Sequence, residues 1–323
     1  MESTRGKIYI TRRLPKEVTS RLQEVFDCKW WDHEDVPVPR ELLLQEIKTA
    51  DGLLSMVTDR IDSELLDAAP RLRAVSNMAV GYDNIQVEEA KKRNVIVCNT
   101  PDVLTETTAD LTVALLLATS RRLEESAIFL KNDEWKSWSP FLLAGLDVHH
   151  KTLGIIGLGR IGQAVARRAF GFGMKVLYYN RHRRMAEEQS LGVEYRDLES
   201  LLRESDFVCV LTPLTADTYH LISERELSQM KPTAVLINTA RGPVVDEVAL
   251  YTALKNNQIW AAGLDVFDRE PVRASHPLVH LPNVLALPHI GSATVDTRMA
   301  MANLAVDNLI LALTGKEPKY RVC

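Results

Sequence analysis

Short apolar runs alternate with helical patterns along most of this 323-residue chain. The runs have the composition of β-strands, and the segments between them carry apolar residues at helical spacing. Such alternation predicts α/β architecture with parallel sheets covered by helices on both faces, because parallel strands need crossover connections. The expected strands are Ile8–Thr11, Gly52–Val57, Leu72–Ser76, Val95–Cys98, Leu153–Ile156, Lys175–Tyr179, Phe207–Leu211, Ala234–Asn238, Trp260–Val266 and Val284–Leu287.

Two long helical patterns interrupt the alternation. One runs from about Thr108 to Lys131 without glycine or proline, so a single helix is expected there. The other runs from about Arg298 to Leu313. An irregular stretch from Asn132 to His150, which includes Trp135 and Trp138, follows the first helix. A long helix between α/β segments is a natural connector between two domains, the number that this chain length suggests.

Composition and charge argue against several function classes. The formal charge is −4, which does not favour nucleic-acid binding. The most apolar stretch, Leu111–Ala118, is shorter than the roughly 20 residues of a membrane span, and the N-terminus lacks the apolar segment of a signal peptide. The four cysteines show no C-x-x-C spacing, so reduced thiols in a cytoplasmic protein are expected, with Cys98 and Cys209 in the core. No histidine or acidic cluster has metal-binding spacing, so no metal is expected.

A glycine-rich turn follows the expected strand Leu153–Ile156 and opens a helical pattern. It fits G-x-G-x-x-G, which in this context predicts a dinucleotide-binding turn. The first glycine permits the tight turn, the second lets the backbone approach a pyrophosphate, and the third allows close helix–strand packing. The helix N-terminus would present free N–H groups to the phosphates. A turn without a ligand is the alternative. The residues concerned are Gly157, Leu158, Gly159, Arg160, Ile161 and Gly162.

The residues after the next expected strand indicate which dinucleotide is bound. NAD-binding proteins usually carry Asp or Glu about 20 residues after the first glycine, where it binds the ribose 2′-hydroxyl. Asn180 stands near that distance and carries no charge. Arg181, His182, Arg183 and Arg184 follow it, and guanidinium groups suit a 2′-phosphate. NADP(H) is therefore favoured over NAD(H), with Arg181 as the principal contact; a solvated basic loop is the alternative.

Three reactive side chains follow expected strands, and ligands of open parallel sheets bind at the carboxyl ends of strands. They are Arg241, Glu270 and His289. Reduction of a ketone leaves an alkoxide that needs a proton, which His289 would supply. Glu270 would hold the imidazole and keep it protonated. Arg241 would polarise the carbonyl and bind a neighbouring carboxylate. Each residue alone could equally have a structural role.

These motifs resemble those of a known family. Over nearly its whole length the chain is similar to the D-isomer-specific 2-hydroxyacid dehydrogenases, and within them most similar to the glyoxylate/hydroxypyruvate reductases. The motifs are Val80-Gly81-Tyr82-Asp83-Asn84, Thr100-Pro101-Asp102-Val103-Leu104-Thr105, the strand and glycine turn 154–162, Asn238-Thr239-Ala240-Arg241-Gly242, Ala262-Gly263-Leu264-Asp265-Val266, and Pro288-His289-Ile290-Gly291-Ser292-Ala293.

The resemblance implies an architecture and further site residues. A Rossmann cofactor domain, residues 102–288, would be inserted into a flavodoxin-like substrate domain, residues 1–101 and 289–323. The N–H groups of Val80 and Gly81 would bind the substrate carboxylate. Asp265 would contact the nicotinamide carboxamide. Further cofactor contacts would come from Thr108, Pro213, Thr239 and Gly291.

The resemblance also implies a homodimer built through the cofactor domains. The 132–150 stretch would lie at that interface, and Trp138 of one copy would wall the active site of the other.

The implied activity is NADPH-dependent reduction of a small 2-oxo acid, such as glyoxylate or hydroxypyruvate, to glycolate or D-glycerate. A 2-ketogluconate reductase is the alternative within the family, and a corepressor-type scaffold that binds a nucleotide is the alternative outside enzymology. Formate dehydrogenases, whose reaction needs no proton donor, carry Gln where Glu270 stands, so Glu270 favours reduction of a 2-oxo acid. Met56, Asn77 and Met78 would border the substrate pocket, but the preferred 2-oxo acid stays open.

Overall fold

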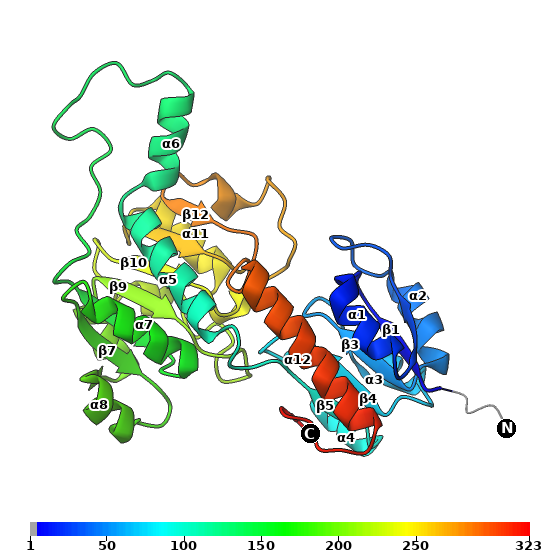
Figure 1. Cartoon of the computed structure of the whole chain (residues 1–323). Coiled ribbons are helices and arrows are strands. Elements are labelled where there is room, and N and C mark those ends of the chain that lie inside the picture. Colours follow the sequence, from blue (N-terminus) through cyan, green and yellow to red (C-terminus); the bar gives the residue numbers. More distant parts are fainter. Residues whose placement is uncertain (1–4) are drawn as a thin grey trace. The chain divides into compact units, whose positions relative to one another are not determined.

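The computed structural model describes residues 5–323 and divides them into two compact units (Figure 1). Unit 1 contains the described residues up to Leu104 together with Thr294–Cys323, and unit 2 contains Thr105–Ala293. The expected breaks, after residues 101 and 288, lie a few residues earlier than these. Each unit holds one sheet in which every strand pair is parallel. The α/β architecture predicted from the alternation is therefore confirmed.

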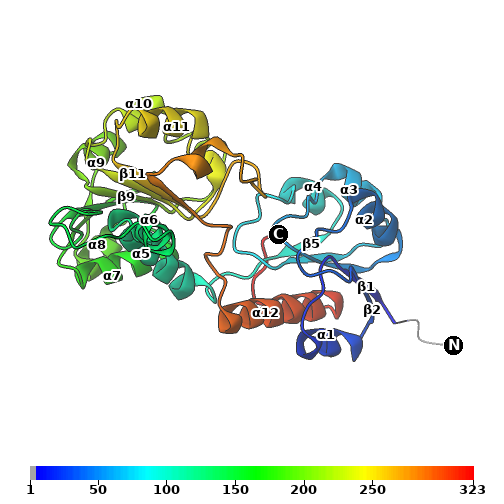
Figure 2. The ribbon, with the colours of Figure 1, turned by 90° about the horizontal axis from the view of Figure 1, so that it is seen from above.

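Unit 1 has a five-stranded sheet in the order β2-β1-β3-β4-β5, the arrangement of a flavodoxin-like fold. Helices α1 and α12 lie on one face, and α2, α3 and α4 lie on the other (Figure 2). A Cβ on Gly52 would lie 2.7 Å from Leu313, so α12 packs directly on β3. The elements are β1 (Lys7–Ile10), α1 (Lys16–Gln23), β2 (Asp27–Trp30), α2 (Arg40–Glu46), η1 (Ile47–Thr49), β3 (Gly52–Ser55), α3 (Ser63–Asp67), β4 (Ala74–Asn77), α4 (Val87–Lys92), β5 (Ile96–Cys98) and α12 (Val295–Leu313).

Unit 2 has a seven-stranded sheet in the order β12-β11-β10-β9-β6-β7-β8. Strands β7 and β8 lie on one side of β6, and β9 to β12 lie on the other. The strand order therefore reverses between β6 and β9, which is the topological switch point, as in a Rossmann fold. The strands are β6 (Thr152–Ile156), β7 (Lys175–Tyr179), β8 (Glu194–Tyr195), β9 (Phe207–Val210), β10 (Val235–Asn238), β11 (Ala261–Leu264) and β12 (Val284–Ala286). The helices are α5 (Thr105–Ser120), α6 (Leu123–Lys131), α7 (Arg160–Phe170), α8 (Met185–Leu191), α9 (Leu198–Glu204), α10 (Glu224–Leu227), α11 (Glu247–Lys255), η2 (Gly242–Val244) and η3 (Pro277–His280).

Alternate residues of the unit 2 strands enter two separate cores. Phe207 and Cys209 pack in the core beneath α5 and α7, whereas Val208 and Val210 pack in the core beneath α9 and α11. Figure 2 shows these helix layers on opposite faces of the sheet. The predicted core positions of Cys98 and Cys209 are confirmed, and burial raises the pKa of both thiols to about 12.

The single helix expected from about Thr108 to Lys131 is wrong. The structure has two helices, α5 and α6, because Arg122 adopts a left-handed conformation with φ of 53°. The Leu146 N–H donates to the Ser120 carbonyl at 2.9 Å, which satisfies a carbonyl at the end of α5. The Arg122 guanidinium donates to both carboxylate oxygens of Glu125. Helix propensity alone, without glycine or proline as a signal, does not reveal this break.

Two short strands at sheet edges, β2 and β8, were not among the expected strands. Their sequences, Asp-Cys-Lys-Trp and Glu-Tyr, mix polar and apolar residues and lack the apolar runs of the central strands. No helix within residues 5–323 is long and apolar enough to cross a membrane.

Candidate active site

The glycine turn joins β6 to α7 in a conformation that requires glycine at two positions. Gly157 has φ of +105°, and a Cβ there would lie 2.8 Å from the backbone of Leu211 and Thr212, beyond β9. A Cβ on Gly162 would lie 2.3 Å from the Gly157 carbonyl oxygen. A Cβ on Gly159 would instead meet no atom of the described chain within 4 Å. Two glycines therefore close the turn, and the third leaves space at the helix N-terminus for a ligand.

Asn180 is part of the same turn. Its Oδ1 accepts a hydrogen bond of 2.7 Å from the Leu158 N–H, and the neighbouring Tyr179 carbonyl accepts one from the Gly157 N–H. Leu158 is fully buried, whereas Gly159 and Arg160 are exposed and Ile161 is half-buried in the first turn of α7. Asn180 thus fixes the turn without placing a negative charge beside it.

A cavity of about 620 Å³ lies next to this turn. Its walls come from three places: the glycine turn, the end of β7 with the residues that follow, and the segment after β9. The sequence-predicted residues that line it are Gly157, Gly159, Asn180, Arg181, His182, Arg183 and Pro213. Arg184 lines it as well.

The arginines of this run differ in how firmly they are held. Arg183 donates to both carboxylate oxygens of Glu188, at 2.7 and 2.8 Å, and its guanidinium lies over the Tyr195 ring. Hydrogen bonds from Arg183 and from the Tyr178 hydroxyl lower the pKa of Glu188 to about 2. Arg181 makes one 2.8 Å ion pair with Asp217, and both side chains are about 70% exposed. Arg181 is therefore the freer of the two to bind an incoming anion.

Asp217 was not identified from the sequence. It also lines the cavity, in the segment that follows β9. Its signal is positional, because the segments after the two strands at the switch point are where ligands of this fold bind. Asp217 belongs to no recognisable sequence motif, so only its position after β9 could have identified it.

The second part of the site lies at the carboxyl ends of β10, β11 and β12. His289 Nδ1 lies 2.6 Å from Glu270 Oε2, and Glu270 Oε1 accepts a hydrogen bond of 3.0 Å from the Phe267 N–H. Burial acts to raise the pKa of Glu270. The hydrogen bond and charge of His289, together with the Phe267 N–H and the Arg241 charge, outweigh burial and lower this pKa. Glu270 is thus held as a carboxylate against the imidazole.

Asp265 fixes the backbone that carries His289. One of its carboxylate oxygens accepts the Ile290 N–H and the other accepts the Gly291 N–H, both at 2.7 Å. His289 has φ of 55°, an uncommon conformation that such tethering stabilises. Asp265 is 1% exposed, and its burial raises its pKa despite the two N–H donors and the nearby His289. The sequence suggested Asp265 as a cofactor contact and gave no sign of this second role.

Arg241 follows β10, and its backbone carbonyl accepts a 2.9 Å hydrogen bond from Asn238. The next residue, Gly242, packs so tightly that a Cβ would lie 1.8 Å from the backbone of Phe267, in the loop that carries Glu270. This contact brings the ends of β10 and β11 together, and the charge of Arg241 acts to lower the pKa of Glu270.

The remaining expected cofactor contacts in unit 2 lie around this second cluster. Thr239 is buried, and its hydroxyl lies 2.8 Å from that of Thr112 in α5. Thr108, one turn earlier in α5, is buried beside Gly291, where an added Cβ would meet it at 3.5 Å. Thr239 and Gly291 follow strands of one parallel sheet, so they share one sheet edge with the glycine turn, and the α5 residues lie beside them. Val80 and Gly81 belong to unit 1, where they are half-buried in the turn after β4.

The comparisons of this chain with known proteins agree on one protein family. Residues 113–291 match the model of the D-isomer specific 2-hydroxyacid dehydrogenase, NAD binding domain. A glyoxylate reductase of Thermococcus gammatolerans is 52% identical, over 97% of this chain and 94% of that protein. One from Korarchaeum cryptofilum is 50% identical over 97% and 94%.

Solved structures extend this similarity to the fold of the whole chain. The TT0316 protein from Thermus thermophilus has a TM-score of 0.92 at 45% identity and covers 98% of this chain and 100% of its own. An NADPH-dependent glyoxylate/hydroxypyruvate reductase from Sinorhizobium meliloti, solved with NADP and malonate, has a TM-score of 0.85 at 37% identity and covers 99% and 97%.

Proposed function

This chain belongs to the family of D-isomer specific 2-hydroxyacid dehydrogenases, which makes it an NAD(P)-dependent dehydrogenase, and from that premise we propose that it reduces small 2-oxo acids with NADPH. Glyoxylate and hydroxypyruvate are the proposed substrates, with glycolate and D-glycerate as products. The names of the similar proteins from Thermococcus gammatolerans and Sinorhizobium meliloti support this choice.

The residues around the glycine turn fit a nicotinamide dinucleotide. The open space at Gly159 admits a pyrophosphate to the N-terminus of α7, where no side chain of the described chain caps the helix. The exposed Arg181 guanidinium supports a 2′-phosphate, and uncharged Asn180 offers it no repulsion. We therefore propose that NADPH is preferred over NADH. When bound, the cofactor would supply the hydride.

The Glu270–His289 hydrogen bond, on the same sheet edge as the glycine turn, is the observation that carries this proposal. His289 donates a proton from Nε2 to the carbonyl oxygen of the substrate as the carbonyl carbon is reduced. Glu270 accepts a hydrogen bond from Nδ1 and so stabilises the protonated imidazole. Asp265 keeps the His289 backbone in place through the Ile290 and Gly291 N–H groups.

Two groups of residues would orient the substrate. Arg241 polarises the carbonyl and binds the adjacent carboxylate through its guanidinium. In unit 1, the N–H groups of Val80 and Gly81 would bind a substrate carboxylate. A 2-oxo acid thus presents one group to be reduced and one group to be held.

Steady-state kinetics test the proposal. We expect measurable kcat/KM with glyoxylate and hydroxypyruvate, and a higher value with NADPH than with NADH. The His289→Ala variant should lose at least about 10²-fold in kcat while its affinity for NADPH is retained. Faster turnover of 2-ketogluconate would identify the other activity of the family. A protein that binds NADPH and oxidises none with these three acids would contradict an enzymatic role and favour a scaffold.

We also propose that two copies associate through α6 and the segment after it. No residue of α6 is buried, and large apolar side chains are exposed in both places. Such a surface on one chain indicates a protein interface. The exposed residues are Leu123, Ile128, Leu130, Trp135, Trp138, Phe141 and Leu142.

A further inference from the structure

The turn after β4 in unit 1 has its carbonyl groups held by three donors. The Ala79 carbonyl accepts a 2.8 Å hydrogen bond from the Thr100 N–H. The Val80 carbonyl accepts one of 2.8 Å from Asn99 Nδ2, and the Gly81 carbonyl accepts one of 3.1 Å from Asn77 Nδ2.

This arrangement fixes the direction of the opposite N–H groups. In a trans peptide the C=O and N–H point to opposite sides, so the N–H groups of Val80, Gly81 and Tyr82 point away from these donors. None of the three N–H groups donates a hydrogen bond to another described residue. Val80 and Gly81 are half-buried and Tyr82 is exposed, so an anion can reach them.

Asn77 is fully buried and its amide is used on both sides. Nδ2 donates to the Gly81 carbonyl and, at 3.2 Å, to Asn84 Oδ1, while Oδ1 accepts from the Ser55 hydroxyl at 3.1 Å. An asparagine amide offers two donors and two acceptor positions, so little freedom remains for this one. Its orientation, and with it the bond to the Gly81 carbonyl, therefore depends on Ser55 and Asn84 together.

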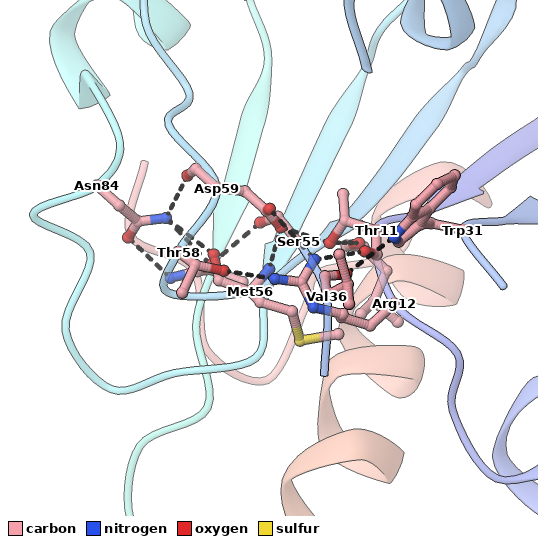
Figure 3. A network of polar contacts seen from close by, with 11 residues as sticks. Thr11, Arg12, Trp31, Val36, Ser55, Met56, Thr58, Asp59 and Asn84 are labelled. Carbon is pink, nitrogen blue, oxygen red and sulfur yellow. Dashed lines mark hydrogen bonds and ion pairs between the residues drawn. The ribbon is translucent and has the colours of Figure 1, made fainter. Parts of the chain in front are cut away.

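Asn84 connects this turn to the segment after β3. Its Nδ2 donates to the carbonyls of Met56 and Asp59, at 3.2 and 2.8 Å. Figure 3 shows Asn84 at one end of this network, with Asp59 and Met56 beside it.

The segment after β3 is itself held by a buried polar cluster (Figure 3). Asp59, 4% exposed, accepts hydrogen bonds from the Met56 N–H at 2.7 Å and from the Thr11 hydroxyl. Arg12, also buried, donates to the Thr11 carbonyl and to the Thr58 hydroxyl, and its guanidinium lies 3.8 Å from Asp59. The ends of β1, β3 and β4 are therefore joined by one network that ends at the Gly81 carbonyl.

We propose that Asn77 and Asn84 are positioning residues for the substrate carboxylate, because they hold the Gly81 carbonyl in place at the end of the turn whose Val80 and Gly81 N–H groups bind the anion. This inference rests on the proposed function, in which those N–H groups bind a 2-oxo acid. It adds two residues that act through the backbone: Asn77, which the sequence placed at the border of the substrate pocket, is fully buried and bonds to the Gly81 carbonyl and to Asn84.

The kinetic signature of this role is specific. The carboxylate does not react, so weaker binding of it raises KM for the 2-oxo acid and leaves kcat nearly unchanged. The Asn84→Ala variant, which removes the Asn84 partner of the Asn77 amide, should raise KM for glyoxylate roughly ten-fold. The Asn77→Asp variant, which puts an acceptor opposite the Gly81 carbonyl, should raise KM further. In both, KM for NADPH should stay within about two-fold of the wild-type value.

Oxalate provides a second readout that does not depend on turnover of the probe. It carries carboxylates and no reducible ketone, so its competitive inhibition constant reports carboxylate binding. We expect this constant to rise in both variants by the same factor as KM.

Asn283→Ala is the matched control. Asn283 in unit 2 also donates Nδ2 to two backbone carbonyls, those of Leu254 and Trp260 at 3.3 and 3.1 Å. It should lower the melting temperature as Asn84→Ala does and leave KM for glyoxylate unchanged.

The outcomes separate this inference from the proposed function. An active wild-type enzyme whose Asn84→Ala and Asn77→Asp variants keep KM and the oxalate constant overturns the positioning role alone, even when both variants are less stable. A wild-type protein inactive with every 2-oxo acid overturns the proposed function and the inference together.

Discussion

At the residue scale, the proposed preference for NADPH rests on one exposed ion pair. Arg181 pairs with Asp217 at the surface, where such pairs contribute only about 0–1 kcal/mol, so a phosphate can replace the carboxylate. We expect Arg181→Ala to raise KM for NADPH roughly 10- to 100-fold, with little effect on NADH, because a charged hydrogen bond to the 2′-phosphate is lost. Steady-state kinetics with both cofactors measure this.

Asp217→Asn should have the opposite effect. Removal of the competing carboxylate frees Arg181 and should lower KM for NADPH about two- to five-fold. Arg183→Ala should weaken NADPH less than Arg181→Ala, because Arg183 is bound to Glu188. If the ratio of KM for NADPH to KM for NADH is unchanged in the Arg181→Ala variant, Arg181 does not bind the 2′-phosphate.

The Glu270–His289 pair also makes a prediction about stability. The pKa of Glu270 lies below its ordinary value of 4.5 in the folded chain, so the pair's contribution is complete above about pH 4.5 and is lost as pH falls through the lowered pKa. The melting temperatures of wild type and Glu270→Gln, measured from pH 6 to pH 3, should therefore converge at the acid end. A gap that widens as pH falls would contradict this direction.

Several residues of the candidate site could be placed from the sequence because they follow strands. Arg241, Glu270 and His289 were identifiable by their positions after apolar runs, and the parallel sheet brings them to one edge. Asp217 and the bonds of Asp265 were not, because a carboxylate in a loop carries no signal for its partner. The direction of a side chain toward a backbone N–H depends on packing, which periodicity does not describe.

At the scale of elements, the glycine turn gives a matched pair of variants. Gly157→Ala places a side chain at φ of +105° and 2.8 Å from the Leu211–Thr212 backbone, which should destabilise the fold by about 2–4 kcal/mol. Gly159→Ala has an ordinary φ of −82° and no neighbour within 4 Å among the described residues, so its melting temperature should match the wild type.

Only Gly159→Ala should separate binding from folding. Its methyl group would occupy the space in which we expect the pyrophosphate, so NADPH affinity should fall at least about ten-fold while thermal unfolding is unchanged. Fluorescence titration of NADPH together with calorimetry tests both points. Unchanged affinity would show that the cofactor does not approach this glycine.

The elements themselves differed in how well they could be predicted. Central strands such as β9 and β10 are buried on both faces and appear as continuous apolar runs. The break between α5 and α6 was invisible, because Arg122 is held in its left-handed conformation by contacts rather than by its residue type.

For the whole molecule, the assignment of segments to units required more than periodicity. Helix α12 lies at the end of the chain and packs on β3 and β4, near its beginning. A helical pattern states that one face is apolar but not which sheet it covers. Resemblance to the family supplied that connection, whereas the alternation of strands and helices supplied only the fold class.

For the whole molecule, we predict that two copies associate through α6 and the segment after it. The exposed side chains of Ile128, Trp138 and Phe141, 50%, 77% and 86% accessible, lie in α6 and the following segment. Light scattering should give a mass of about twice 36.3 kDa for the wild type. Ile128→Glu and Phe141→Glu should give the monomer, because a charge in an apolar interface is not compensated.

Val248→Glu is the control for that experiment, since Val248 is an equally apolar residue that is 78% exposed on α11. It should leave the mass unchanged, which separates the position of the patch from a general effect of added charge. Trp138→Ala then tests whether the arm of one copy contributes to the active site of the other. If it does, the ratio of kcat/KM for glyoxylate and hydroxypyruvate changes while the mass stays that of a dimer; an unchanged ratio limits Trp138 to association.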